Sequence, residues 1–268
     1  MRFLAKIWTA LTALKRGGIH FVISLLREKC GLPIPQSVRS RWMGGIASEI
    51  MYWDLYFQGQ RSKWDESCEA RMNPDAKLQQ RPAALLPQTE EAHILDVGAG
   101  PLTYLGKRMA GTKVRITAVD SLAPEYDLLL KKHNIQPLVR TQLSDAEHLT
   151  DNFGSDSFDL VVARNCIDHS YDPLRAIVEM VKVVKPECYV LLEHRPNEGT
   201  RRKHGGLHQW NLSATDCGDF IIESLHSSIN VSRQCSALCD ISCELAEEGH
   251  WLITRIRKKC GTKTAVTE

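Results

Sequence analysis

The sequence predicts an α/β fold: a doubly wound, mostly parallel sheet of seven strands, with an antiparallel C-terminal hairpin and a helical N-terminal extension. Three observations predict it. A buried-type strand over 94–97 ends in a turn that contains Gly98 and Gly100. Strand-like and helix-like stretches alternate from residue 92 onward. Residues 240–259 read as two strands joined by a Glu-Glu-Gly-His turn, which is typical of a hairpin.

The first strand is apolar on both faces, because Ile94, Leu95 and Val97 are all apolar, as in the central strands of parallel sheets. The glycines that follow indicate a sharp turn, where a ligand can approach the backbone closely. A helix is expected over 102–110. The glycines would then lie between the carboxyl end of a strand and the N-terminus of a helix.

The remaining elements follow in chain order. Strands are expected over 113–120, 137–142, 157–165 and 188–196, and helices over about 124–133 and 172–186. Pro186 is expected to end the second of these helices, because proline cannot donate a helical hydrogen bond.

Length and composition set limits on the function. The 268 residues suffice for one α/β domain, expected over 91–258, preceded by a helical extension over 1–90 and followed by a flexible tail over 259–268. The net charge of +2 and the lack of a basic stripe with interleaved aromatic residues give no support for a nucleic-acid partner. The sequence gives no prediction of the oligomeric state.

The nine cysteines do not form a disulfide framework typical of small secreted domains. Cys235, Cys239 and Cys243 are four residues apart, which does not match the spacing of zinc or iron–sulfur sites. We therefore expect reduced, partly buried thiols that pack as small apolar groups, in a cytoplasmic protein.

The N-terminal 31 residues have an amphipathic helical pattern, interrupted by Lys6, Lys15 and Arg16. No stretch reaches the ~18 uncharged apolar residues that are needed to span a bilayer. Packing of this helix on the domain is the favoured interpretation. Peripheral membrane contact, with the basic residues facing anionic lipid, is the alternative.

A second helix is expected before residue 60, where Ile46, Ile50, Trp53 and Phe57 recur at helical spacing. Two interpretations stay open. The helix packs on the domain, or it forms a cover that closes over a bound ligand.

The glycine turn does not match the dinucleotide fingerprint, because Thr103 stands where its third glycine belongs. In addition, Asp96 precedes the turn by two residues, and a carboxylate there disfavours a pyrophosphate. A positively charged ligand fits better. An NAD-linked oxidoreductase is therefore the disfavoured alternative.

Acidic residues follow the next two strands. Asp120 ends the strand over 113–120, where a carboxylate can accept hydrogen bonds from both hydroxyls of a ribose. Asp145 can accept from the amine of an adenine, while the backbone N–H of Ala146 or Glu147 donates to the ring. Asp145 has a second interpretation, as the N-cap of a short helix. The pattern indicates an adenosine site without a pyrophosphate partner.

Five stretches, DVGAGP, ITAVD, SDAEHL, SFDLVVARNCIDHSYDP and VVKPECYVLLEH, resemble in order the motifs of class I S-adenosylmethionine-dependent methyltransferases. The resemblance covers about residues 92–195 and implies a Rossmann-like sheet with S-adenosylmethionine as cofactor. It implies that Asp96 and the Gly98–Gly100 turn hold the methionine portion, Asp120 with Ser121 the ribose, Asp145 with Ala146 and Glu147 the adenine, and that the backbone at Arg164 and Asn165 lies under the sulfonium.

The reaction that this implies is an SN2 transfer, in which the protein aligns donor and acceptor and excludes water. A hydroxyl acceptor needs a base more than an amine or thiol does. His169, just beyond the fourth strand, and His208, in the long segment over 194–213, are the candidate catalytic bases.

The segment over 194–213 is also the expected substrate loop. Its predicted binding residues are His194, Gln209, Trp210 and Asn211, a mixture of aromatic and planar polar groups that suits polyhydroxyl ligands. The alternative is a solvated loop that Trp210 merely anchors. A looser resemblance of EIMYWD and GLHQWN to methyltransferases of bacterial surface-polysaccharide assembly supports a saccharide.

The resulting expectation is methyl transfer from S-adenosylmethionine to a small-molecule or saccharide acceptor, with oxygen favoured. No clear set of acids for a magnesium ion is present near the donor, so transfer without a metal is expected. A catalytically inactive S-adenosylmethionine-binding protein and a membrane-peripheral protein are the remaining alternatives.

Overall fold

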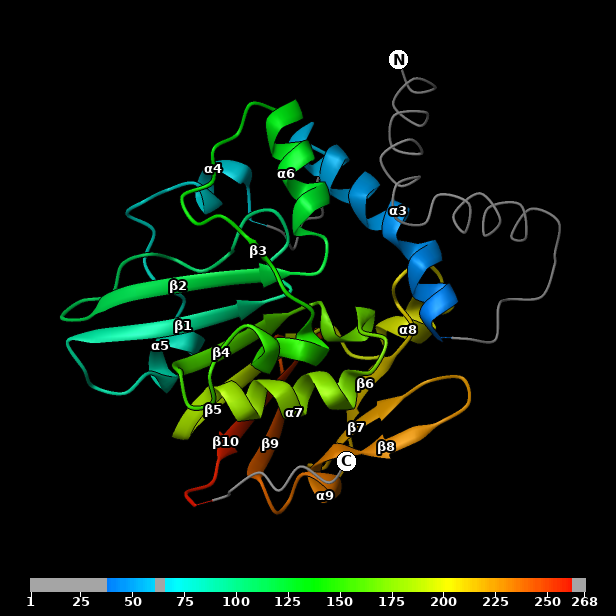
Figure 1. Cartoon of the computed structure of the whole chain (residues 1–268). Coiled ribbons are helices and arrows are strands. Elements are labelled where there is room, and N and C mark those ends of the chain that lie inside the picture. Colours follow the sequence, from blue (N-terminus) through cyan, green and yellow to red (C-terminus); the bar gives the residue numbers. More distant parts are fainter. Residues whose placement is uncertain (1–37, 61–65, 262–268) are drawn as a thin grey trace, which may run out of the picture.

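The computed structural model describes residues 38–60 and 66–261 (Figure 1). The predicted N-terminal amphipathic helix, with its membrane contact, and most of the predicted tail lie outside these ranges. Within them, no helix combines the length and the apolar character needed to cross a membrane.

The centre of the molecule is a seven-stranded sheet with the strand order β3-β2-β1-β4-β5-β10-β9. The first five strands of this order, from β3 at the edge to β5, run parallel to one another. Strand β10 pairs antiparallel with both β5 and β9. This confirms the predicted doubly wound fold with its C-terminal hairpin. The strands are β1 (Glu91–Val97), β2 (Lys113–Asp120), β3 (Gln142–Leu143), β4 (Phe158–Arg164), β5 (Val184–His194), β9 (Cys239–Ala246) and β10 (Trp251–Lys258).

Both faces of the sheet are buried. Along β1, Leu95 and Val97 contribute to one core and Ile94 to the other. The first core includes α7 (Pro173–Val183), and the second includes residues from the N-terminal segment around α5 (Gln80–Leu85). In Figure 1, α7 and α5 lie on opposite faces of the sheet.

The strand order reverses at β1, because β2 lies on one side of it and β4 on the other. At such a point the crossover connections leave in opposite directions, and a crevice opens at the carboxyl ends of the strands. The arrowheads of β1 and β2 point toward the helix α3 (Val38–Phe57), which crosses this end of the sheet (Figure 1).

Helix α3 packs on α6 (Ala123–Lys132) through an aromatic cluster in which Trp53 and Tyr126 have centroids 6.2 Å apart. A buried carboxylate adds to this contact, since Asp54 accepts from Lys132 Nζ at 2.7 Å and lies 2.7 Å from His133 Nε2. The expected helix before residue 60 is therefore present, and it packs on the domain.

The predicted helix over 102–110 is wrong. Residues 101–107 are irregular, and Arg108 and Met109 take part only in isolated bridges. The N-terminal segment supplies the hydrogen bonds that a helix would make internally. Lys107 N donates to Ala76 O at 2.8 Å, and Gly106 N donates to Gln79 Oε1 at 3.1 Å.

Two element boundaries also differ from the prediction. The third strand is limited to Gln142–Leu143 instead of 137–142. Helix α7 ends at Val183, and β5 continues directly from it through Pro186. The pairing of β4 with β5 shifts register between Phe158 and Leu160, so the proline falls in an irregular stretch where its missing N–H interrupts no regular ladder.

A second sheet was not predicted. It consists of β6 (Asn211–Ala214), β7 (Phe220–Glu223) and β8 (Ser228–Asn230), and α9 (Val231–Gln234) follows it. Phe220 of this sheet is fully buried in the first core. The same core contains Cys235 and Cys239, each 2% exposed, which confirms the prediction that these thiols serve in packing. All eight cysteines of the described residues are free thiols.

Candidate functional site

A cavity of about 590 Å³ lies at the carboxyl ends of β1, β2 and β4, a volume typical of small-ligand sites. Helix α3 closes one side of it with Trp42, Ser48, Glu49, Tyr52 and Trp53. All ten predicted cofactor residues line it, namely Asp96, Gly98, Gly100, Asp120, Ser121, Asp145, Ala146, Glu147, Arg164 and Asn165. The structure thus brings together residues that come from four separate loops.

The glycine turn after β1 forms the floor of the cavity. Gly98 and Gly100 have φ angles of 67° and 65°, which side-chain-bearing residues adopt only with strain. A Cβ at Gly98 would lie 2.4 Å from Cys166 Cβ, and one at Gly100 would lie 2.5 Å from the ring of Trp53. Both positions therefore require glycine, and they leave the backbone open to a ligand.

Asp96 lies buried beneath this turn. Its Oδ2 accepts a hydrogen bond from Thr103 Oγ1 at 2.5 Å. Burial raises the pKa of Asp96 to about 6, although the Thr103 hydrogen bond and the charges of Arg71 and Arg164 oppose this shift. A ligand with a positive charge nearby would favour the ionised carboxylate.

Asp120, at the end of β2, is held in a defined orientation. It accepts from Gly100 N at 3.1 Å and from Leu122 N at 2.9 Å. Burial is the largest cause that raises its pKa, to about 7, and the two backbone hydrogen bonds oppose it. Each carboxylate oxygen has a further lone pair, which suits recognition of two neighbouring hydroxyls.

The three residues predicted to meet the adenine have different surroundings. Asp145 precedes the 3₁₀ helix η1 (Ala146–Asp151), but its side chain makes no capping hydrogen bond. The Glu147 carboxylate is buried and accepts from Tyr171 N at 3.0 Å and from Asp172 N at 3.3 Å. Burial raises the pKa of Glu147 to about 7. Its side chain thus orders the loop before α7.

The side chain of Arg164 has a structural role. Its guanidinium lies 4.6 Å from the Tyr104 ring centroid and 4.8 Å from that of Trp251, and it donates to Glu66 at 2.7 Å. Asn165, with a φ of 50°, donates its backbone N–H to Glu193 O at 3.0 Å. Both residues line the cavity, where the prediction places the sulfonium end of the cofactor.

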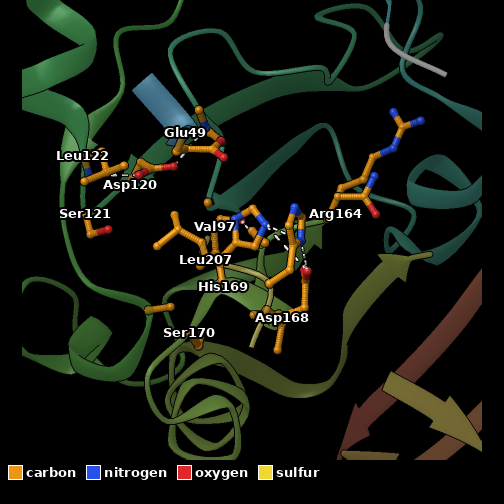
Figure 2. A pocket seen from close by; sticks show the side chains of 18 of the residues that line it. Glu49, Val97, Asp120, Ser121, Leu122, Arg164, Asp168, His169, Ser170 and Leu207 are labelled. Atoms are coloured by element: carbon orange, nitrogen blue, oxygen red, sulfur yellow. Dashed lines mark hydrogen bonds and ion pairs between the residues drawn. The ribbon is translucent and has the colours of Figure 1, made fainter. Parts of the chain in front are cut away.

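The two predicted catalytic histidines meet at one wall of the cavity. His169 Nε2 lies 3.1 Å from His208 Nδ1, and His208 Nδ1 lies 2.7 Å from Oδ2 of the buried Asp168. His169 belongs to the 3₁₀ helix η2 (Ile167–His169), whereas His208 comes from the predicted substrate loop. Figure 2 shows Asp168 and His169 on the opposite side of the cavity from Asp120.

In this cluster, the negative charge of Asp168 and the positive charge of a protonated histidine stabilise each other. Burial opposes ionisation of Asp168, yet the charge of His169 and the hydrogen bond with His208 hold its pKa well below the usual range. Burial also opposes protonation of His208, but the Asp168 hydrogen bond and charge raise its pKa. In the described part of the chain, these three residues lie close enough together to hold a metal ion.

The four predicted substrate residues do not line the cavity. His194 is buried, and its Nε2 accepts from Cys166 N at 3.3 Å and from Ile167 N at 3.1 Å. Burial lowers the pKa of His194 to about 4, which keeps the ring neutral as an acceptor. It therefore supports the loop that carries His169.

The other three shape the loop over 194–213. Gln209 Nε2 donates to Gly206 O at 2.7 Å, and Asn211 Oδ1 accepts from Thr200 N at 2.7 Å. The Trp210 indole is buried and donates to Ser170 O at 2.8 Å. The structure thus matches the alternative in which Trp210 anchors the loop, because a buried indole cannot stack on a ligand.

Several cavity residues were missed by the sequence analysis. Asp168 stands beside His169 in the motif NCIDHSYDP, so its position was a signal. For Glu49, the sequence predicted only the helix that contains it and gave no indication that its side chain lines a cavity. Arg71, from α4 (Cys68–Arg71), had no sequence signal. Its Nη1 donates to Leu102 O at 2.7 Å, and its buried Nε has no hydrogen-bond partner.

Comparisons with known proteins identify part of this chain. Residues 95–192 match the family model described as a methyltransferase domain. No curated protein sequence matches the chain.

Solved structures similar to this chain include two methyltransferases, of which the first shows the same fold. A phosphoethanolamine N-methyltransferase 2 from Haemonchus contortus, in complex with phosphomonomethylethanolamine and S-adenosylhomocysteine, is 14% identical, with a TM-score of 0.51 over 85% of this chain and 61% of that one. A SAM-dependent methyltransferase from Methanosarcina mazei is 17% identical, with a TM-score of 0.40 over 68% of this chain and 99% of that one.

The family match spans the strands β1 to β5 that form the base of the cavity, while α3, Arg71 and His208 lie outside it. The order of the sheet, the glycine turn and the carboxylates after β1 and β2 agree with that match. No helix begins at the glycine turn, so the helix N-terminus that a dinucleotide phosphate would need is missing from these fully described residues. Residues 95–192 therefore form a methyltransferase domain, and the protein is an enzyme with S-adenosylmethionine as its cofactor.

Proposed function

We propose that the protein transfers the methyl group of S-adenosylmethionine to an oxygen of a small polar acceptor that binds beside His169 and His208. The observation that supports this proposal is the cluster of Asp168, His169 and His208 on the cavity wall. A base at this place is of most use when the acceptor is a hydroxyl, which must lose its proton.

The proposed step is a direct displacement. The S–CH₃ bond breaks while the acceptor oxygen forms a bond with the methyl carbon, and S-adenosylhomocysteine leaves. The acceptor proton passes to the imidazole of His208. Asp168 lies 2.7 Å from this ring and stabilises the imidazolium that forms.

The cofactor is proposed to lie across the ends of β1, β2 and β4. Asp120 would accept the ribose hydroxyls, and Asp145 the adenine amine. Asp96 would favour the positively charged methionine end. We add Arg71 to the predicted contacts, because its partly unsatisfied guanidinium lines the cavity and can pair with the methionine carboxylate.

The acceptor is proposed to be a small molecule, and small saccharides are among the candidates. The four loop residues that suggested a saccharide lie outside the cavity, so they no longer support it. The aromatic surface near the histidines comes instead from Trp42 and Tyr171, whose ring centroids are 6.4 Å apart.

The test is transfer of a labelled methyl group to a panel of alcohols, phenols, sugars and amines, read by mass spectrometry. With an oxygen acceptor, His208→Gln and Asp168→Asn should each lower kcat by roughly 10²-fold or more. Affinity for S-adenosylmethionine should change by less than about twofold, because neither side chain belongs to the proposed cofactor contacts.

His204→Gln is the matched control, since His204 lies in the same loop and does not line the cavity. Its kcat should stay near that of the parent. Transfer to amines alone, or an unchanged rate in His208→Gln, would contradict the proposed oxygen acceptor and its base.

A further inference from the structure

Three side chains in the cavity wall bring possible metal-ligand atoms close together. These atoms are Asp168 Oδ2, His169 Nε2 and His208 Nδ1, and they lie within 4.8 Å of one another. Their separations are 2.7 Å from Asp168 to His208, 3.1 Å between the histidines, and 3.6 Å from Asp168 to His169. Figure 2 labels two of these residues, Asp168 and His169, on the cavity wall.

We propose that Asp168, His169 and His208 bind a divalent transition-metal ion. A triangle with the sides given above has a point outside its plane that lies about 2.1 Å from all three corners, which is a typical Zn–N or Zn–O distance. The ligand atoms therefore need little movement to receive an ion.

Hydrogen bonds alone satisfy this cluster poorly. His208 Nδ1 lies within reach of both Asp168 Oδ2 and His169 Nε2, and a single N–H there can point well at only one of them. One cation would satisfy the lone pairs of all three atoms at once.

The backbone around the ligands is already fixed. Gln209 N donates to Asp168 O at 3.0 Å, which ties the loop of His208 to the η2 segment. His169 N donates to Cys166 O at 3.0 Å. Such supporting contacts orient metal ligands before the ion arrives.

The ligand set also indicates the kind of metal. Two imidazoles and one carboxylate suit Zn²⁺, Fe²⁺, Co²⁺ or Ni²⁺, whereas Mg²⁺ and Ca²⁺ prefer oxygen ligands. Three protein ligands leave at least one coordination position open, which is typical of catalytic sites. Because all three residues line the cavity, that position is available to an acceptor oxygen. The inference thereby departs from the expectation of transfer without a metal. It also replaces the base role proposed for His208 in the metal-bound protein, because a ring that binds an ion through Nδ1 carries its proton on Nε2 and cannot accept another.

The experiment uses full-length, untagged protein that has been treated with a chelator and dialysed. Titration with Co²⁺ should give a visible d–d absorption band with one equivalent bound, without the near-ultraviolet charge-transfer band of cysteine ligation. Zn²⁺ should displace Co²⁺ and Mg²⁺ should not. His208→Gln and Asp168→Asn should each weaken Zn²⁺ binding at least tenfold in calorimetry.

His204→Gln is again the control and should bind Zn²⁺ like the parent, with circular dichroism to verify that all variants are folded. Absence of a bound equivalent, or equal Zn²⁺ affinity in the parent and in both ligand variants, would overturn the proposal. The titration contains neither S-adenosylmethionine nor an acceptor. Its failure would therefore remove the metal site and leave the proposed methyl transfer standing.

Discussion

At the scale of single residues, two partly desolvated carboxylates line the end of the cavity that is proposed to hold the cofactor. Burial raises the pKa of Asp96 to about 6 and that of Asp120 to about 7. Such acids are costly to ionise in the ligand-free protein. A positively charged nucleoside would favour the ionised form of both acids. Binding of such a ligand should therefore be coupled to loss of their protons.

The first prediction concerns Asp120→Asn. Loss of a charged hydrogen-bond acceptor from the ribose should weaken S-adenosylmethionine binding by about 1.5–3 kcal/mol, which is roughly tenfold to a hundredfold in Kd. Calorimetric titration measures this change. Asp151→Asn, on an exposed position of η1, should bind like the parent. An unchanged Kd in Asp120→Asn would remove the ribose role.

The second prediction concerns pH. An acid whose pKa is raised by folding keeps its proton in the folded protein at pH values where the unfolded chain has lost it. Stability of the ligand-free protein should therefore decrease as the pH rises from about 4 to about 7.

Cofactor affinity should have the opposite trend, because the ribose requires the ionised carboxylate of Asp120. From pH 5.5 to 7.5, affinity for S-adenosylmethionine should increase about 25-fold, in proportion to the ionised fraction of an acid with a pKa of about 7. Titrations in two buffers with different ionisation enthalpies would show proton release on binding. Asp120→Asn should have a flatter profile, and a profile equal to that of the parent would assign the titration to another group.

At the scale of elements, α3 is the segment that completes the cavity. It contributes Trp53 to the surroundings of Gly100 and is tied to α6 by the buried Asp54. Burial opposes ionisation of Asp54, but the hydrogen bonds from Lys132 and His133 outweigh it and lower the pKa. This contribution to stability is present above the unfolded pKa near 4 and is lost as the pH falls through the lower folded value.

The third prediction follows from this contact. Asp54→Asn leaves Lys132 facing a neutral group and should lower the free energy of unfolding by about 1–3 kcal/mol, as measured by urea denaturation. Asp127→Asn removes the exposed ion pair with Arg140 and should change the free energy of unfolding by less than about 0.5 kcal/mol. Similar losses in both variants would show that burial of Asp54 is not the cause.

At the scale of the whole molecule, the second sheet is an integral part of the fold. Leu212, Phe220 and Ile222 belong to the same core as Leu95, Val161 and the other apolar residues of the main sheet. The two sheets should therefore unfold together.

The fourth prediction tests this coupling. Phe220→Ala should reduce stability by about 3–5 kcal/mol, because it leaves a cavity in the shared core. The urea transitions by tryptophan fluorescence and by circular dichroism should stay coincident. Leu225→Ala, at a side chain that is 53% exposed, is the control and should have little effect. A separate early transition in Phe220→Ala would show that the second sheet is an independent unit.

The sequence alone determined the parallel sheet and its hairpin, and it predicted ten cofactor residues that the structure brings to one cavity. These features depend on local patterns: apolar runs, a glycine turn after Val97, and carboxylates at strand ends such as Asp120. The carboxyl ends of parallel strands must meet at one edge, so a local pattern is enough to place the cofactor residues together.

Only the tertiary structure decided which neighbours each remaining segment meets. Residues 101–107 have helical periodicity, but hydrogen bonds to Ala76 and Gln79, far away in the chain, keep them irregular. Trp210 faces the core and His208 faces the cavity, although they are two residues apart. Their roles depend on long-range packing, which competes with local preference and which no single stretch of sequence contains.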